Sequence, residues 1–156
     1  NILAFDGYYE KKWFPYTMPI SDIYGLRQAF DNIKNDPYML ERHAKIGNAV
    51  RAAVKEAGLE LYQETGFSNT VTVFNVPEGT TDTAILTAMK EKCNIMLAGS
   101  FGAFAGKVIR IGHMGENAYP EKVGAVMAGL DLVFKDLGIT LKCSLKEAYD
   151  RKMSEQ

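Results

Sequence analysis

The sequence has few of the residues from which metal centres and disulfide scaffolds are built. Its two cysteines, Cys93 and Cys143, lie far apart, and its two histidines, His43 and His113, lack any spacing typical of metal ligands. Zinc sites need such side chains at close and regular intervals, so neither a metal site nor a disulfide framework is expected. We expect two buried, reduced thiols, which are typical of a cytoplasmic protein.

Long apolar runs and blocks of like charge are also missing. No stretch approaches the roughly 20 apolar residues of a membrane span, and no charged-then-apolar leader marks export. The chain carries 18 Lys and Arg against 19 Asp and Glu, scattered along its 156 residues. This balance argues against nucleic acid or a membrane surface as the main partner, and it favours small molecules or other proteins.

The start of the sequence has no methionine and is rich in aromatic residues, as the middle of a domain would be. We therefore expect a piece of a longer chain. With 47% apolar residues, the 156-residue chain has enough material for a globular core. The one candidate boundary lies near the Asn35-Asp36 break.

Apolar residues at helical spacing predict five helices. Ser21 is expected to cap the first, Asp36-Pro37 to open the second, and Thr81 to cap the third. The second helix is expected to carry its basic residues, Arg51 among them, on its solvent-facing side. The expected helices cover residues 21–34, 37–57, 81–93 and 120–137, followed by an exposed helix within 144–156.

Four short runs rich in β-branched or apolar residues predict strands at 59–62, 70–76, 95–98 and 108–111. The strands come in adjacent pairs with helices between the pairs. That order is typical of an α+β fold, with a small, mostly antiparallel sheet covered on one face by helices.

The glycine-rich stretch GSFGAFAG at residues 99–106 resembles a phosphate-binding loop only superficially. The motif requires glycine where Phe101 stands and a hydroxyl residue where Val108 follows Lys107, and a strand comes next instead of a helix. We expect a flexible connection whose small residues let another group approach closely.

Arg110 interrupts the apolar strand at 108–111. Side chains alternate along a strand, so Ile109 and Ile111 are expected to face the helices and Arg110 the opposite face, beside Gly112. Two roles remain open for it: a solvated or salt-bridged surface residue, or a fork of donors for a carboxylate.

No catalytic residue is predicted, because the sequence shows no Gly-x-Ser-x-Gly elbow, no Cys/His pair and no convincing pair of carboxylates. His43 is expected on a helix face. His113, just past a strand, is expected to be a loop-surface or capping residue.

Three segments together resemble one family: KVIRIGHMG at 107–115, PYTMPISDIYGLRQAF at 15–30 and RHAKIGNAVRAAVKEAGLELY at 42–62. Their order and spacing resemble the C-terminal part of class V pyridoxal-phosphate aminotransferases, the alanine–glyoxylate and serine–pyruvate branch. The similarity extends to about residue 140. It implies that 1–35 is the end of the cofactor-binding large domain with its linking helix, and that 36–156 is the small domain.

The resemblance implies roles for individual residues. Arg110 would hold the substrate carboxylate, and the 99–106 loop with Ser100 would border the substrate pocket. Thr17 would reach the phosphate of a cofactor held by the neighbouring subunit, with Tyr16 as a second candidate, which implies a homodimer. Thr17 as a simple helix cap remains the alternative.

The family's Schiff-base lysine has no counterpart here, because Lys11, Lys12 and Lys107 stand in the wrong context. The resemblance therefore implies an inactive portion of a pyridoxal 5'-phosphate enzyme that moves an amino group between a small amino acid and a 2-oxo acid such as glyoxylate or pyruvate. The alternative is a stand-alone, non-catalytic ligand- or partner-binding module. The amino donor, and transamination against other class V chemistry, stay open.

Overall fold

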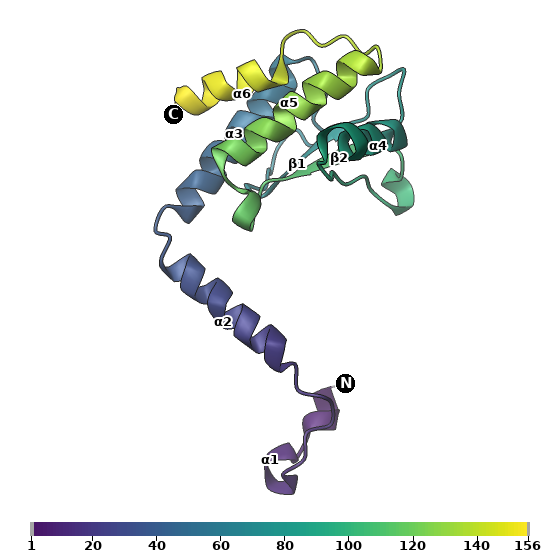
Figure 1. Cartoon of the computed structure of the whole chain (residues 1–156). Coiled ribbons are helices and arrows are strands. Elements are labelled where there is room, and N and C mark those ends of the chain that lie inside the picture. The colour runs from purple at the N-terminus through teal and green to yellow at the C-terminus, as the bar shows by residue number, and fades with distance from the viewer. Residues whose placement is uncertain (1, 156) are drawn as a thin grey trace. The chain divides into compact units, whose positions relative to one another are not determined.

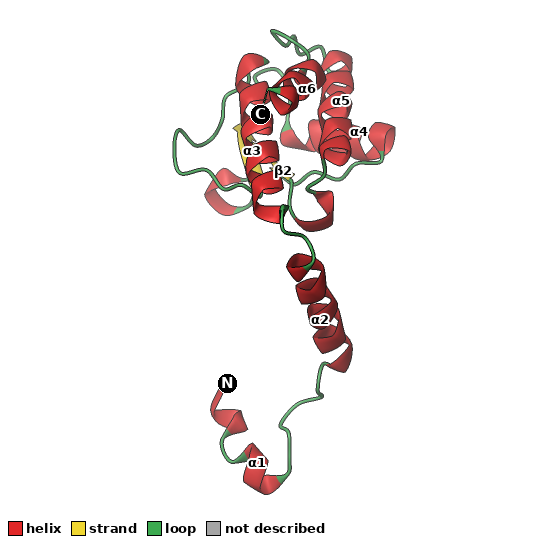
Figure 2. Ribbon diagram, turned by 90° about the vertical axis from the view of Figure 1, so that its left-hand side faces the viewer, coloured by secondary structure: helices red, strands yellow, loops and turns green. Residues whose placement is uncertain are grey.

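A computed structural model of the chain describes residues 2–155 (Figure 1). The chain forms two compact units, residues 1–39 and residues 40–156. Helices make up most of the regular structure, and strand is confined to one short pair (Figure 2). Among the described helices, none has both the length and the apolar character that crossing a membrane requires.

The first unit contains a short 3-10 helix (Ile2–Phe5), α1 (Tyr8–Lys11) and α2 (Ile20–Lys34). The residue that caps α2 is Pro19, not Ser21 as expected, because the helix begins at Ile20 and takes Ser21 into its first turn. No residue of α2 is buried, and its predicted apolar stripe is at least half exposed: Ile23, Leu26, Phe30 and Ile33.

The second unit contains the sheet and the remaining helices. The helix α3 begins at Met39, two residues beyond the expected Pro37. The elements follow in the order α3 (Met39–Glu56), β1 (Val71–Asn75), α4 (Asp82–Cys93), a 3-10 turn (Gly102–Phe104), β2 (Val108–Gly112), a 3-10 turn (Gly115–Asn117), α5 (Pro120–Asp136) and α6 (Leu145–Ser154).

The strands β1 and β2 pair antiparallel, with Val73 opposite Arg110 and Phe74 opposite Ile109. The expected strands at 59–62 and 95–98 are wrong as strands, since each makes one bridge, Leu61 with Phe74 and Ala98 with Arg110. Both segments begin while still bonded to the end of a helix, and they reach the sheet only from residue 60 in the first segment and at residue 98 in the second. The amide of residue 59 bonds to α3, and that of residue 95 bonds to α4.

One face of the sheet forms the core, in agreement with the predicted α+β class. Phe74, Ile109 and Ile111 are fully buried there, and the Phe74 ring lies 6.4 Å from that of Phe134 on α5. The helices α3 and α5 lie on the same side of the sheet (Figure 1). The opposite face, which we call the outer face, carries Arg110.

The C-terminal helix α6 is not the exposed helix that the sequence predicts. Leu145, Ala148 and Tyr149 are buried, and α6 packs along α5. Asp131 of α5 fixes its start, because the carboxylate accepts bonds from the Ser144 hydroxyl (2.6 Å) and from the first two amides of the helix (2.7 and 3.0 Å). The two cysteines are free and half-buried at the margin of this core, where burial was expected.

The prediction that Arg51 faces solvent is also wrong, because its side chain is buried and only 7% exposed. Its Nη1 donates to the Ser68 carbonyl (2.8 Å), its Nη2 donates to Asn48 (2.6 Å), and its guanidinium lies 5.0 Å from the centre of the Phe67 ring. The arginine therefore secures the long connection before β1 to the side of α3.

Candidate functional site

Arg110 stands in the middle of β2 on the outer face, as the alternation of side chains predicts. Ile109 and Ile111 on either side are fully buried, while Arg110 is half-buried. Across the outer face Arg110 lies between two neighbours in the register, Val73 on β1 and Ala98 on the other side. Tyr62 lies beyond Val73 in the same row.

The Arg110 side chain makes one hydrogen bond, from Nε to the Gly99 carbonyl oxygen at 2.6 Å. Within the described residues 2–155, no carboxylate forms an ion pair with it, and its two terminal nitrogens have no hydrogen-bond acceptor. A half-buried cation without a counter-charge is costly for the fold alone. The salt-bridged role is thus absent from this part of the molecule, and the guanidinium is left available to an external anion.

The 99–106 loop runs beside Arg110 and is held at both ends. Ala98 and Arg110 exchange two backbone hydrogen bonds (2.7 and 3.3 Å) at its start, and Lys107 accepts one from Val76 (2.8 Å) at its end. Midway, the Phe104 ring meets the Tyr62 ring edge-on, with 5.2 Å between centroids. Gly102 and Gly106 adopt φ values of +60° and +75°, which side chains disfavour.

Ser100 lies in this loop, one residue from the carbonyl that Arg110 binds. It is half-buried, and its hydroxyl has no hydrogen-bond partner among the residues that the structure describes. The structure therefore brings Ser100 into the neighbourhood of Arg110 through Gly99, with a hydroxyl that is free to donate.

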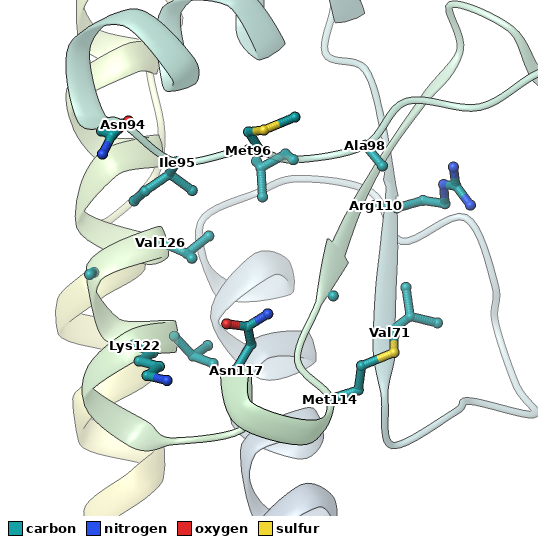
Figure 3. Close-up of a pocket in the computed structure, with 14 residues that line it drawn as sticks. Val71, Asn94, Ile95, Met96, Ala98, Arg110, Met114, Asn117, Lys122 and Val126 are labelled. Carbon is teal, nitrogen blue, oxygen red and sulfur yellow. The ribbon is translucent and has the colours of Figure 1, made fainter. Parts of the chain in front are cut away.

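A groove of about 840 Å³ opens at the edge of the sheet next to Arg110 (Figure 3). Its walls are the 94–98 segment, β2 and α5, and most of its lining is apolar. In Figure 3 the Arg110 side chain points away from Asn117 and Lys122, which line the groove's other end. The groove contains neither Ser100 nor the residues predicted to reach a cofactor.

Tyr16 and Thr17 lie in the first unit, in the segment before α2, and both are exposed. The Tyr16 ring packs 5.8 Å from that of Phe5. Thr17 does not cap α2, because Pro19 holds that position without a side-chain bond, and the Thr17 hydroxyl has no partner among the described residues.

His113 is fully buried, in contrast to the surface or capping role expected for it. Its Nδ1 lies 3.1 Å from the Asn69 carbonyl, which can only accept, so Nδ1 carries the proton and Nε2 accepts from the Thr72 hydroxyl at 2.9 Å. Burial, with a smaller contribution from the nearby Arg51 cation, lowers the pKa of His113 to about 4.

Gly47 explains how α3 approaches this histidine. A Cβ at Gly47 would lie 3.1 Å from Arg51 Nη1 and 3.3 Å from His113 Cε1. The sequence contains one indication of this contact, because a glycine within a helix often marks a place where another part of the chain packs closely against the helix. The second histidine, His43, is 7% exposed, and its Nε2 accepts from the Gly115 amide at 3.3 Å.

The described residues contain no group of three or more histidine, cysteine, aspartate or glutamate side chains that could hold a metal ion. The chemistry of the outer face is therefore that of a fixed guanidinium beside a glycine-rich loop.

Comparison with known proteins places this unit in a family. The chain is 37% identical over 146 residues to an uncharacterised aminotransferase of Methanocaldococcus jannaschii, which covers 91% of this chain and 38% of that protein. It is 36% identical over 130 residues to the serine–glyoxylate aminotransferase of Arabidopsis thaliana, which covers 81% of this chain and 32% of the relative. No family model matches.

Solved structures agree. The ureidoglycine–glyoxylate aminotransferase of Bacillus subtilis matches 99% of this chain and 41% of its own with a TM-score of 0.87 and 26% identity. The pyridoxamine–pyruvate aminotransferase of Mesorhizobium loti matches 92% of this chain and 38% of its own, with a TM-score of 0.83 and 29% identity. The chain belongs to the class V aminotransferases and corresponds to their C-terminal portion. It spans about a third of the length of the curated relatives that it matches.

Proposed function

We propose that this chain supplies the substrate-anchoring part of an aminotransferase that moves an amino group between a small amino acid and a 2-oxo acid such as glyoxylate or pyruvate. The observation that carries the proposal is Arg110, a half-buried cation without an acidic partner in residues 2–155. Relatives whose names state glyoxylate or pyruvate as a substrate support the choice of acids.

Arg110 would act by binding the carboxylate that both substrates share. Because Nε is engaged by Gly99, the two terminal nitrogens remain as a fork, and a fork matches the two oxygens of a carboxylate. Bidentate binding fixes the orientation of the substrate as well as its position, which is how an anchor contributes to rate. The free hydroxyl of Ser100 would add one more donor beside the same carboxylate.

The cofactor of this reaction would be pyridoxal 5'-phosphate, which supplies the electron sink for the bond changes at the substrate's Cα. Thr17 and Tyr16 suit a phosphate, because both are exposed hydroxyl residues and the Thr17 hydroxyl is unpaired within the described chain. We assign them to the phosphate of a cofactor held by the neighbouring subunit of a homodimer. No lysine of this chain is assigned to covalent attachment, so the chain by itself would not transaminate.

The domain assignment follows from the same proposal. Residues 1–35 would end the cofactor-binding domain and 36–156 would form the small domain, in a cytoplasmic enzyme. The exposed apolar stripe of α2 supports this, since Ile23, Leu26 and Phe30 are 51%, 57% and 62% exposed and suit a surface that the rest of the enzyme covers.

The test is the Arg110→Lys variant of the complete enzyme. A lysine keeps the charge but cannot reproduce the fork, so KM for the amino acid and the 2-oxo acid should both rise, and kcat/KM should fall roughly 10- to 100-fold. Arg151→Lys is the matched control, because that arginine lies on α6 in an exposed pair with Glu56.

Unchanged kinetics in Arg110→Lys would remove this arginine from the site. A complete enzyme that transfers no amino group from any donor to glyoxylate or pyruvate would contradict the proposal itself and favour the alternative of a non-catalytic binding module.

A further inference from the structure

The direction of the Arg110 fork depends on one contact. An arginine on a strand has four side-chain torsions, and within the described residues only the bond from Nε to the Gly99 carbonyl restrains its head group. That bond is short, at 2.6 Å, and it comes from a charged donor, which makes it one of the stronger kinds. The position of the Gly99 carbonyl therefore sets where the two terminal nitrogens point.

Gly99 sits against the first turn of α4. A Cβ at this position would lie 3.2 Å from Asp82 Oδ2, which is closer than a methyl group normally approaches an oxygen, and 3.4 Å from Leu86 Cδ1, which is an ordinary contact. The absence of a side chain at Gly99 is what lets the loop approach the helix this closely.

The surface behind Gly99 is firmly held. Asp82 Oδ1 accepts from the Thr83 amide at 2.6 Å and from the Thr83 hydroxyl at 3.2 Å, so its carboxylate cannot turn away without losing both bonds. The Thr81 hydroxyl caps the same turn by accepting from the Ala84 amide at 3.1 Å. If a side chain were added at Gly99, the loop would have to move, and the carbonyl would move with it.

We propose that Gly99 is a positioning residue for substrate binding: its carbonyl aims the Arg110 guanidinium, and its missing side chain lets the first turn of α4 hold that carbonyl in place. This inference rests on the proposed function, because it assigns Arg110 to the substrate carboxylate. Gly99 itself touches no substrate and acts only through Arg110.

The inference predicts a specific kinetic pattern. A shift of a few tenths of an ångström weakens the hydrogen bond without removing the arginine. Gly99→Ala should therefore raise KM for the amino acid and for the 2-oxo acid by a similar factor, roughly three- to tenfold, since both substrates present the same carboxylate. Gly99→Val should raise both further, and kcat should stay within about twofold.

The experiment uses the complete enzyme. The measured quantities are KM for both substrates, kcat, the inhibition constant of propionate as a simple competing carboxylate, and the melting temperature. The rescue variant combines Gly99→Ala with Asp82→Ala, which removes the oxygen that the new methyl group would meet. The control is Gly25→Ala in α2, where a Cβ would meet no atom within 4 Å.

We expect the propionate inhibition constant to rise with KM in Gly99→Ala, and the double variant to return to within about twofold of Asp82→Ala alone. Gly25→Ala should leave both KM values, kcat and the inhibition constant unchanged, and it should not lower the melting temperature, because alanine favours a helix more than glycine does. If Gly99→Ala fails to accumulate as folded enzyme and Asp82→Ala does not relieve the defect, the contact with Asp82 is not the cause and the inference is overturned.

Three other outcomes distinguish a failure of this inference from a failure of the proposed function. If Arg110→Lys impairs binding but Gly99→Ala and Gly99→Val leave KM and the inhibition constant unchanged, the inference fails and the proposed function stands. A lower melting temperature or kcat without any change in KM assigns Gly99 a structural role only, and this too overturns the inference. If Arg110→Lys also has no effect, Arg110 does not hold the substrate carboxylate, and this inference fails together with that assignment.

Discussion

Acid should weaken the second unit through His113. Its imidazole is buried in the neutral form between the Asn69 carbonyl and the Thr72 hydroxyl, and burial lowers its pKa to about 4. In the unfolded chain a histidine has a pKa of about 6.5. The folded pKa is the lower of the two, so the contribution of His113 is complete above pH 6.5 and is lost as the pH falls from 6.5 towards 4.

The size of this effect follows from the two pKa values. A separation of about 2.5 pKa units corresponds to about 3 kcal/mol of unfolding free energy at 25 °C, present at pH 7 and lost by pH 4. This is a large share of the roughly 5–15 kcal/mol that stabilises a typical domain. The hydrogen bond from Arg151 lowers the pKa of the Glu56 carboxyl, so the contribution of Glu56 to stability is lost only below the ordinary pKa of a glutamate.

The assay compares the natural chain with a His113→Gln variant, which cannot titrate at this position. Urea unfolding is followed by far-ultraviolet circular dichroism at several pH values between 7 and 4. Tryptophan fluorescence would not report on this unit, because the single tryptophan, Trp13, lies in the first unit. The variant should be less stable at pH 7, and the difference between the two proteins should shrink by about 3 kcal/mol by pH 4. If the difference in unfolding free energy between the two proteins stays constant from pH 7 to pH 4, the reasoning is refuted.

Further substitutions test the packing around the site. Thr72→Val leaves His113 Nε2 buried without its donor and should cost about 1–3 kcal/mol in urea unfolding, and an unchanged midpoint would argue against that bond. Asp131→Ala removes the carboxylate that holds the start of α6 and should cost about 2 kcal/mol, with a loss of helical signal; full retention would contradict its role. On β2, Ile109→Ala should cost about 2–5 kcal/mol, while Arg110→Ala should cost less than about 1 kcal/mol. Equal costs would show that Arg110 serves the fold.

The sequence predicts α3, α4 and α5 well, because each has a periodic apolar face and recognisable ends. Thr81 caps α4 as expected, and Pro120 opens α5. The segments at 59–62 and 95–98 were predicted as strands from composition alone. Composition does not reveal that each segment is still bonded to the preceding helix when it reaches the sheet.

Buried polar residues were harder to predict for a different reason. Arg51 is buried by a bond to Ser68, 17 residues away, and His113 by bonds to residues 41 and 44 positions earlier in the chain. A helical period shows only which face Arg51 occupies, and a position just past a strand indicates only that His113 begins a loop. Neither pattern shows which distant polar group will meet the side chain, so the sequence predicts both residues at the surface.

The site itself was predicted in part. Alternation along the strand gives the face on which Arg110 lies, because Ile109 and Ile111 must enter the core. Its bond to Gly99 depends on the path of the 99–106 loop, and a glycine-rich sequence allows many paths. The roles of Thr17, Tyr16 and Ser100 rest on the family resemblance and stay predictions.

The most direct test of the central claim is a crystal structure of the complete enzyme with a 2-oxo acid bound. The account predicts that both terminal nitrogens of Arg110 bind the two carboxylate oxygens at about 2.7–2.9 Å, with Nε still on the Gly99 carbonyl. An acidic residue from the rest of the enzyme paired with Arg110, with the substrate carboxylate bound elsewhere, would contradict it.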